Sequence, residues 1–270
     1  MRILWIYQVS KSLKMHKPNT NKLLITDRLL ISDIDNTLLS GSIHSARNRI
    51  ALTKLMNYLQ SSEIAFGIAT GRSIESAKQI LEEWKVSLPD LWITSVGSEI
   101  HYGEEMQADL DWCEHINYQW QPELVRQAIA KLSGIKLQST EGQRLHKISY
   151  LVDPTKSPSI REIQAHLRKH QLQVQAIYSH QEFLDILPLR ASKGDAVKYC
   201  ANKWNFSMAN ILVAGDSGND EQMLTSGANA VVVGNYSSEL EKLRGQDHIY
   251  FTEGSYAQGI LEAIVHHQWL

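Results

Sequence analysis

Short apolar segments alternate with helix-like segments at both ends of this sequence, and that alternation limits the folds open to the chain. Near the N-terminus, the apolar run 29–31 is followed by apolar residues at helical spacing over 44–59 and by a strand-like run over 64–69. The same order returns near the C-terminus, where the sequence predicts strands at 211–214 and 230–233 and helices at 192–204, 220–225 and 257–267. Such alternation predicts an α/β, Rossmann-like fold, in which an open parallel sheet carries helices on both faces.

The pattern changes in the middle of the chain. Strand-like segments at 148–152 and 183–187 are mixed there with helix-like segments at 122–132 and 159–170. We interpret this region as a separate α+β domain inserted into the first. The predicted division is an N-terminal arm or linker at 1–26, a core at 27–110 and 188–270, and a cap domain at 111–187.

Composition limits the class of protein. With 270 residues, of which 43% are apolar and 21% charged, the chain can bury one large core and a second, smaller one. Its net charge of -2 supplies no positive field for a polyanion, so we expect no nucleic-acid partner. No apolar run approaches the roughly 18 residues of a membrane span, so we expect no membrane partner.

Two further features concern location and the N-terminal segment. Cys113 and Cys200 lie far apart and form no CxxC pattern, which argues against a disulfide-stapled secreted domain and favours the cytoplasm. Residues 8–24 are polar and lysine-rich without periodicity, so we predict a linker or a loosely docked arm there.

The strongest local signal is the acidic pair Asp33 and Asp35, which directly follows an apolar strand. In extended backbone, residues two apart project to the same side, so both carboxylates can converge just past the end of the strand. Two like charges held close together are costly unless a cation or a shared proton compensates them. The pair therefore predicts a metal, although an acidic turn alone is also an ordinary loop or helix cap.

Three more elements fall where open parallel sheets place their ligands, just after a predicted strand or at a predicted helix start. The hydroxyl of Thr70 and the amide of Gly71 can donate to an anion, and Lys193 adds a point charge near a helix start capped by Ser192. The loop 215–220 adds Asp216 and Asp220, whose oxygens suit a hard cation. Each element alone reads as a turn or a surface lysine, but their combination predicts one site.

The ordered set Asp33-x-Asp35-x-Thr37, Thr70-Gly71, Lys193 and Gly215-Asp216-x-x-x-Asp220 resembles the haloacid dehalogenase superfamily of phosphotransferases. Three further segments resemble sucrose-phosphate phosphatases and the phosphatase-like C-terminal domains of bacterial sucrose-phosphate synthases: Thr94–Ile100, Lys147–Tyr150 and Leu184–Pro188. The resemblance extends from about Asp27 to the C-terminus.

The resemblance implies a role for each motif residue. Asp33 would be the nucleophile that forms an aspartyl-phosphate, and Asp35 the general acid and base. Magnesium (Mg2+) would bind at Asp33, Asp35, Asp216 and Asp220. Thr70, the Gly71 amide and Lys193 would hold the phosphoryl oxygens. Arg72 and Asn219 would also bind the substrate, and Asn219 would help to orient its neighbours. An acid at Asp35 is expected in a phosphatase, since it must protonate a poor alkoxide leaving group.

The resemblance also implies the substrate, although it leaves alternatives open. Sugar hydroxyls would meet Ser98, Glu99, Lys147 and Asp185, with the inserted domain as a lid. The substrate would be sucrose 6-phosphate, or else mannosylfructose phosphate or another sugar phosphate. Two other functions stay open. The chain could be a non-catalytic, phosphatase-like partner of a sucrose-phosphate synthase, or it could be a mutase. A synthase is a possible partner in each case, and we expect a monomer.

Overall fold

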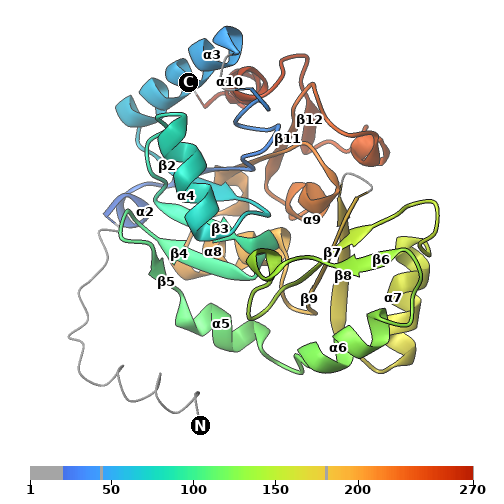
Figure 1. Cartoon of the computed structure of the whole chain (residues 1–270). Helices are drawn as coiled ribbons and strands as arrows, with labels where there is room; N and C mark the ends of the chain where they lie inside the picture. Colours follow the sequence, from blue (N-terminus) through green and yellow to red (C-terminus); the bar gives the residue numbers. More distant parts are fainter. Residues whose placement is uncertain (1–20, 43–44, 180–181, 270) are drawn as a thin grey trace, which may run out of the picture.

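The computed structural model describes residues 21–42, 45–179 and 182–269, which build two sheets with separate sets of helices (Figure 1). The larger sheet has eight strands and the smaller has four. Among the described residues, no helix combines the length and the apolar character of a membrane span.

The larger sheet is mixed. In spatial order its strands are β12 (Ile249–Phe251), β11 (Asn229–Val232), β10 (Ile211–Gly215), β1 (Arg28–Ser32), β2 (Ile64–Ala69), β3 (Leu91–Thr94), β4 (Glu99–Tyr102) and β5 (Gln107–Ala108). From β12 to β3 the strands run parallel, as predicted for this sheet, although β3 and β12 were not among the predicted strands. β4 and β5 add an antiparallel edge that the sequence pattern also did not predict. The chain places β2 and β3 on one side of β1 and later adds β10, β11 and β12 on the other side, so the strand order reverses at β1 and a crevice opens at the carboxyl ends of β1 and β10.

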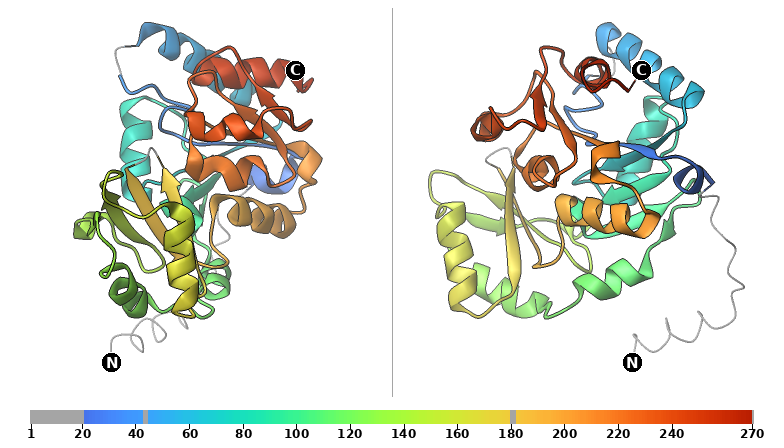
Figure 2. Two further views of the ribbon diagram at one scale, coloured as in Figure 1. Left: turned by 90° about the vertical axis from the view of Figure 1, so that its right-hand side faces the viewer. Right: turned by 180° about the vertical axis from the view of Figure 1, so that it is seen from behind.

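Helices cover both faces of the larger sheet because alternate strand residues point to opposite sides. Leu29 and Ile31 of β1 pack with α5 (Leu110–Ile116), α8 (Lys193–Trp204) and α9 (Glu221–Leu224). Leu30, between them, packs with the helices of the opposite face. Those helices are α3 (Ala46–Ser61), α4 (Ile74–Glu83) and α10 (Ala257–His266). Figure 2 shows α3 and α10 side by side, although they come from opposite ends of the chain.

The smaller sheet is antiparallel and has helices on one face only. Its order is β6 (Ile135–Leu137), β7 (Ile148–Val152), β9 (Phe183–Pro188) and β8 (Val174–Ser179), with α6 (Pro122–Ile129) and α7 (Ile160–Lys169) packed on it. The other face turns toward the larger sheet (Figures 1 and 2). We propose the division predicted above, a core at 27–110 and 188–270 and a cap at 111–187, with the qualification that α5 packs in the core's own hydrophobic cluster.

The N-terminal prediction is partly wrong. Residues 21–25 form α2 (Asn21–Ile25), whose Leu23 is only 1% exposed and packs in the same hydrophobic cluster as Leu29. A buried leucine docks this end of the predicted arm onto the core, so it is not a loose linker. Residues 1–20, and His44 at the start of the predicted helix 44–59, lie outside the described residues.

Candidate active site

The first acidic pair lies where β1 leaves the sheet. The amide of Asp33 donates to the carbonyl of Ala214 at 2.9 Å, so pairing with β10 extends one residue beyond β1 and fixes Asp33 at the crevice. Asn36 then takes a left-handed conformation with φ of 59°, which asparagine tolerates better than most residues. The chain turns back at once, and the Asp35 side chain stays 46% exposed.

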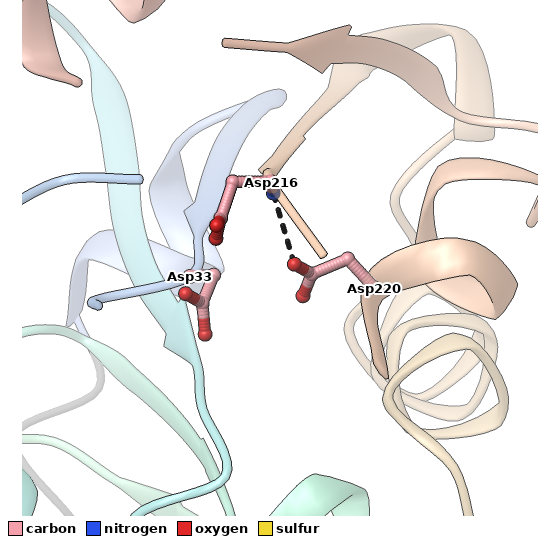
Figure 3. A group of neighbouring side chains, drawn as sticks. All are labelled: Asp33, Asp216 and Asp220. Atoms are coloured by element: carbon pink, nitrogen blue, oxygen red, sulfur yellow. Dashed lines mark hydrogen bonds between the residues drawn. The ribbon is translucent and has the colours of Figure 1, made fainter. Parts of the chain in front are cut away.

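The second acidic pair follows β10 and meets the first. One oxygen of Asp220, Oδ2, accepts hydrogen bonds from the amides of Asp216 at 3.0 Å and Ser217 at 3.1 Å. Thr37 donates to Asp216 Oδ1 at 2.9 Å and so ties this loop to the one after β1. Carboxylate oxygens of Asp33, Asp216 and Asp220 all lie within 4.8 Å of one another (Figure 3).

Gly215 is required for that approach. A Cβ added at Gly215 would lie 2.5 Å from the Cβ of Asp220, closer than two carbon atoms can pack. Only glycine therefore lets the carboxylate of Asp220 fold back over the end of β10.

Lys193 joins the two acidic pairs. It is the first residue of α8, behind the N-cap Ser192, and its side chain is fully buried. Its ammonium lies 2.7 Å from Asp33 Oδ1, 2.7 Å from Asp220 Oδ1 and 3.0 Å from Asn219 Oδ1. Burial lowers the pKa of Lys193, but the carboxylates of Asp220 and Asp33 outweigh it and hold the pKa above its usual value. Lys193 is therefore a permanent cation at this site.

One ammonium does not balance three carboxylates. Burial raises the pKa of Asp33 well above 3.8, although Lys193 opposes this, and burial together with Asp220 raises the pKa of Asp216 to about 7. When all four groups are ionised, the cluster carries an excess of two negative charges. A donor set of buried carboxylate oxygens with uncompensated charge suits a hard divalent cation.

The loop after β2 faces the acids. Thr70 is fully buried, and its hydroxyl oxygen accepts from the amide of Arg72 at 3.2 Å. The guanidinium of Arg72 forms a bidentate ion pair with Asp35, in which Nε lies 2.7 Å from Oδ2 and Nη2 lies 2.7 Å from Oδ1. Arg72, predicted to bind substrate, thus lies at the site but is engaged by a carboxylate of the protein.

A cavity of about 360 Å³ separates this floor from the open face of the smaller sheet. Its floor is lined by Asp33, Asp35, Gly71, Arg72, Ser217 and Asn219, and its roof by Gln138, Lys147, Ser149, Ser179, Phe183 and Asp185. The volume lies within the range of small-molecule sites. The structure therefore joins the acidic cluster to a half-open cavity of a size that suits a small polar ligand.

The roof contains two of the four predicted sugar contacts. Lys147 donates to the carbonyl of Gly71 at 3.1 Å and lies 3.9 Å from Asp185 Oδ1. Ser149, directly opposite Asp185 in the sheet, donates to the same carboxylate. Our sequence reasoning missed Ser149, although its position two residues beyond Lys147 on one strand placed it on the same face.

The other two predicted sugar contacts, Ser98 and Glu99, do not line this cavity. Ser98 is 2% exposed and donates to the carbonyl of Ser95 at 2.9 Å. Glu99 Oε2 accepts from the hydroxyl of Ser95 at 2.9 Å, and its Oε1 lies 3.9 Å from the guanidinium of Arg144 in the cap. Both side chains therefore contact other residues of the protein in this arrangement and do not face the cavity.

Comparison with known proteins places these features in a family. The family described as sucrose-6F-phosphate phosphohydrolase matches residues 26–268. Probable sucrose-phosphatase 3b of Arabidopsis thaliana is 31% identical over 250 residues, and sucrose-phosphatase 1 of Nicotiana tabacum is 33% identical over 254. These matches cover 88% of this chain but only 59% and 58% of the two relatives, so the chain spans under two thirds of their length.

A solved structure is similar over nearly its whole length. The sucrose-phosphatase of Synechocystis sp. PCC6803, determined in complex with sucrose and phosphate, superposes with a TM-score of 0.83 at 33% identity. The match covers 90% of this chain and 99% of that one.

Proposed function

Because the chain belongs to the sucrose-6F-phosphate phosphohydrolase family, within the haloacid dehalogenase superfamily, we propose that it hydrolyses sucrose 6-phosphate to sucrose and phosphate. The observation that carries this proposal is the convergence of Asp33, Lys193, Asp216 and Asp220 beneath the cavity. A nucleophile, a permanent cation and a cation-binding acid set are the groups that phosphoryl transfer needs.

In the first step, a carboxylate oxygen of Asp33 attacks phosphorus, and the bond from phosphorus to the sugar oxygen breaks. Asp35 gives its proton to the departing oxygen, so that the sugar leaves as an alcohol. In the second step, water attacks the phosphoryl-Asp33 and Asp35 takes up a proton from that water. Inorganic phosphate leaves, and both carboxyl groups return to their starting states.

The floor residues hold the phosphoryl oxygens in this proposal. The ammonium of Lys193 is already 2.7 Å from the nucleophilic carboxylate, so it meets an incoming phosphoryl group without moving far. Gly71 and Arg72 line the cavity floor and are proposed to contact the phosphoryl oxygens together with the buried Thr70, and Asn219 orients Lys193. Such preorganised donors stabilise charge that develops in the transition state.

Mg2+ is the proposed cofactor, since it prefers oxygen ligands. The proposed ligands are the carboxylates of Asp33 and Asp216 and the backbone carbonyl of Asp35, with Asp220 behind them. When bound, it neutralises charge on the phosphoryl oxygens. The excess negative charge of the ionised cluster supports a divalent rather than a monovalent ion.

The cap residues Lys147 and Asp185 are proposed to bind sugar hydroxyls from the roof. Ser98 and Glu99 remain proposed contacts that need a rearrangement of the cap against the core. A synthase partner, a monomeric state and a cytoplasmic location are also proposals.

The test is phosphate release from a panel of sucrose 6-phosphate, mannosylfructose phosphate, fructose 6-phosphate and glucose 6-phosphate, with Mg2+ and with EDTA. We expect Mg2+-dependent release that is fastest with sucrose 6-phosphate. Asp33→Asn should abolish it, whereas Asp111→Asn, which changes an 84% exposed carboxylate outside the site, should not. Activity retained by Asp33→Asn would refute the covalent mechanism. If the chain binds a synthase but releases phosphate from no sugar phosphate, the result would favour the non-catalytic partner. If, in labelled water, the phosphoryl group is returned to a sugar instead of to water, the result would favour the mutase.

A further inference from the structure

The backbone between β3 and β4 has an unusual conformation. Three successive residues, Ser95, Val96 and Gly97, have φ values of 52°, 61° and 91°, and we call them the left-handed turn. Left-handed residues normally occur singly and are glycine, asparagine or aspartate, so a β-branched residue such as Val96 is an outlier there. All three residues are buried. Strained backbone persists only where the surrounding structure holds it, and it gathers at functional sites.

One side of the left-handed turn holds the loop after β2. The backbone amide of Ser95 donates to the carbonyl of Arg72 at 2.8 Å, and that of Val96 donates to the carbonyl of Thr70 at 2.9 Å. These two hydrogen bonds hold the residues before and after Gly71. The positions of the Thr70 side chain and the Gly71 amide, both proposed to bind phosphoryl oxygens, therefore depend on the turn.

The other side of the left-handed turn meets the start of α8. A Cβ added at Gly97 would lie 2.2 Å from the carbonyl carbon of Ser192 and 2.5 Å from the amide nitrogen of Lys193. The backbone of the turn is thus packed directly against the peptide bond that precedes Lys193. The buried indole of Trp112, on α5, donates to the Gly97 carbonyl at 3.1 Å and also holds the turn. The turn therefore lies between the loop after β2 and the catalytic lysine.

Glu99 closes the left-handed turn at its base. Thr94 and Glu99 are opposite each other in the pairing of β3 with β4, so the turn is the loop of a hairpin. The hydroxyls of Thr94 and Ser95 both donate to Glu99 Oε2, at 3.1 and 2.9 Å. Hydrogen bonds to a carboxylate are stronger than those between neutral groups. Glu99 is therefore well placed to stabilise the strained backbone.

We propose that the left-handed turn is a spacer that positions the phosphoryl-binding groups, with Thr70 and Gly71 on one side and Lys193 on the other, and that Glu99 is the positioning residue that holds it. This inference rests on the proposed function. The spacing matters because one phosphoryl group must meet both sets of donors at once. Glu99 has this role in the arrangement described above, whereas its proposed sugar contact requires the cap to rearrange.

The experiment uses inorganic phosphate, a probe without a sugar, whose Kd is measured by calorimetry with Mg2+. We expect Glu99→Ala to raise this Kd about tenfold, since the two sets of donors are no longer held at their spacing. kcat/KM should fall by the same factor for sucrose 6-phosphate and for p-nitrophenyl phosphate, because both use the phosphoryl site. Glu99→Gln, whose amide oxygen still accepts from a hydroxyl, should recover part of the affinity.

Two control variants isolate the contact with the turn. Glu162→Ala also removes a carboxylate that accepts a serine hydroxyl, that of Ser159, but on an exposed end of α7. Arg144→Gln removes the ion pair between Glu99 and the cap and keeps the hydroxyl contacts of Glu99. Both should leave the Kd of phosphate unchanged. A rise in Kd with Arg144→Gln equal to that with Glu99→Ala would overturn the role of the turn.

The remaining outcomes separate the spacer from other roles of Glu99. A loss with sucrose 6-phosphate alone, at unchanged phosphate Kd, would make Glu99 a sugar contact and overturn the spacer. A lower Tm with unchanged Kd and kcat/KM would mean that Glu99 only supports the fold, and would overturn it as well. A wild-type chain that binds phosphate but releases it from no sugar phosphate would refute the proposed function. The Kd values of wild type and Glu99→Ala would then still decide whether the turn positions the phosphate-binding groups.

Discussion

The guanidinium of Arg72 binds both carboxylate oxygens of Asp35, each at 2.7 Å, across 37 residues of sequence. This two-point contact fixes the orientation of Asp35 as a carboxylate, the form that we propose takes up a proton from the attacking water. In the same proposal, Asp35 releases one of the two contacts when it carries the proton that it gives to the leaving group. The contact also gives Arg72 a second role besides the predicted one of binding the substrate.

The leaving group distinguishes the two roles of Arg72. Arg72→Lys removes the bidentate contact with Asp35. We therefore expect kcat/KM for sucrose 6-phosphate to fall by about tenfold, as for one lost charge-assisted hydrogen bond. p-Nitrophenyl phosphate releases a stable phenolate that needs little help from an acid, so its kcat/KM should change much less. Equal losses with both substrates would identify Arg72 as a phosphoryl ligand instead. Arg126→Lys, in a surface pair of the same arginine exposure, is the control.

Lys193 is predicted to be essential for both activity and stability. Lys193→Met removes a positive charge from the phosphoryl site and should lower kcat by about a thousandfold. It also leaves buried carboxylates without a partner, which costs about 3–5 kcal/mol in free energy of unfolding without Mg2+. Urea unfolding in EDTA measures that cost. Lys156→Met, which breaks an exposed pair with Asp153, should leave the stability close to that of the wild type. A Lys193 variant as stable as this control would contradict the buried cluster.

Asp216 predicts an unusual pH dependence in the metal-free protein. Its folded-state pKa of about 7 lies above the usual 3.8, so between these values the folded protein binds a proton that the unfolded chain lacks. The contribution of Asp216 to stability is therefore largest near pH 4 and is lost as the pH rises to about 7. In EDTA, raising the pH from 5 to 7.5 should lower Tm more in wild type than in Asp216→Asn. Saturating Mg2+ should remove the difference, since it stabilises the ionised carboxylates. Parallel Tm curves in EDTA would contradict the raised pKa.

The parts of the fold that the sequence predicted are those with strong local periodicity. β1, β2 and β10 are short apolar runs, and the helices α3 and α8 have apolar residues at helical spacing. β4 and β5 were missed because an antiparallel edge alternates apolar with polar residues such as His101, and β5 has only two residues. α2 was missed because a five-residue helix among polar residues has almost no periodic signal.

The site divides in a similar way. The core motifs follow strands or begin helices, and parallel strands bring those positions to one edge, so their convergence could be predicted from order alone. The cap contacts depend on how one sheet lies over another, which sequence order does not specify. Lys147 and Asp185 therefore line the cavity, whereas Ser98 and Glu99 do not, and the pairing of Ser149 with Asp185 emerges only from the register.

The side chain of Gln143 forms hydrogen bonds with the backbone of β7 in the way that a neighbouring strand would. Its amide oxygen accepts from the Ser149 backbone amide at 3.2 Å, and its amide nitrogen donates to the Ser149 carbonyl at 3.0 Å. Ser149 in turn holds the carboxylate of Asp185. Gln143→Ala should lower the free energy of unfolding by about 1–2 kcal/mol, since a backbone amide loses its partner.

The kinetic consequence of that substitution separates positioning from support of the fold. If Gln143 holds Ser149 and Asp185 in place for the sugar, KM for sucrose 6-phosphate should rise by about threefold or more while KM for p-nitrophenyl phosphate stays constant. Gln79→Ala provides the control, because Gln79 donates to Glu83 on its own exposed helix face, outside the cavity. If stability falls while both KM values stay unchanged, Gln143 stabilises β7 but does not contribute to recognition of the sugar. Sugar binding would then tolerate a shift of Ser149.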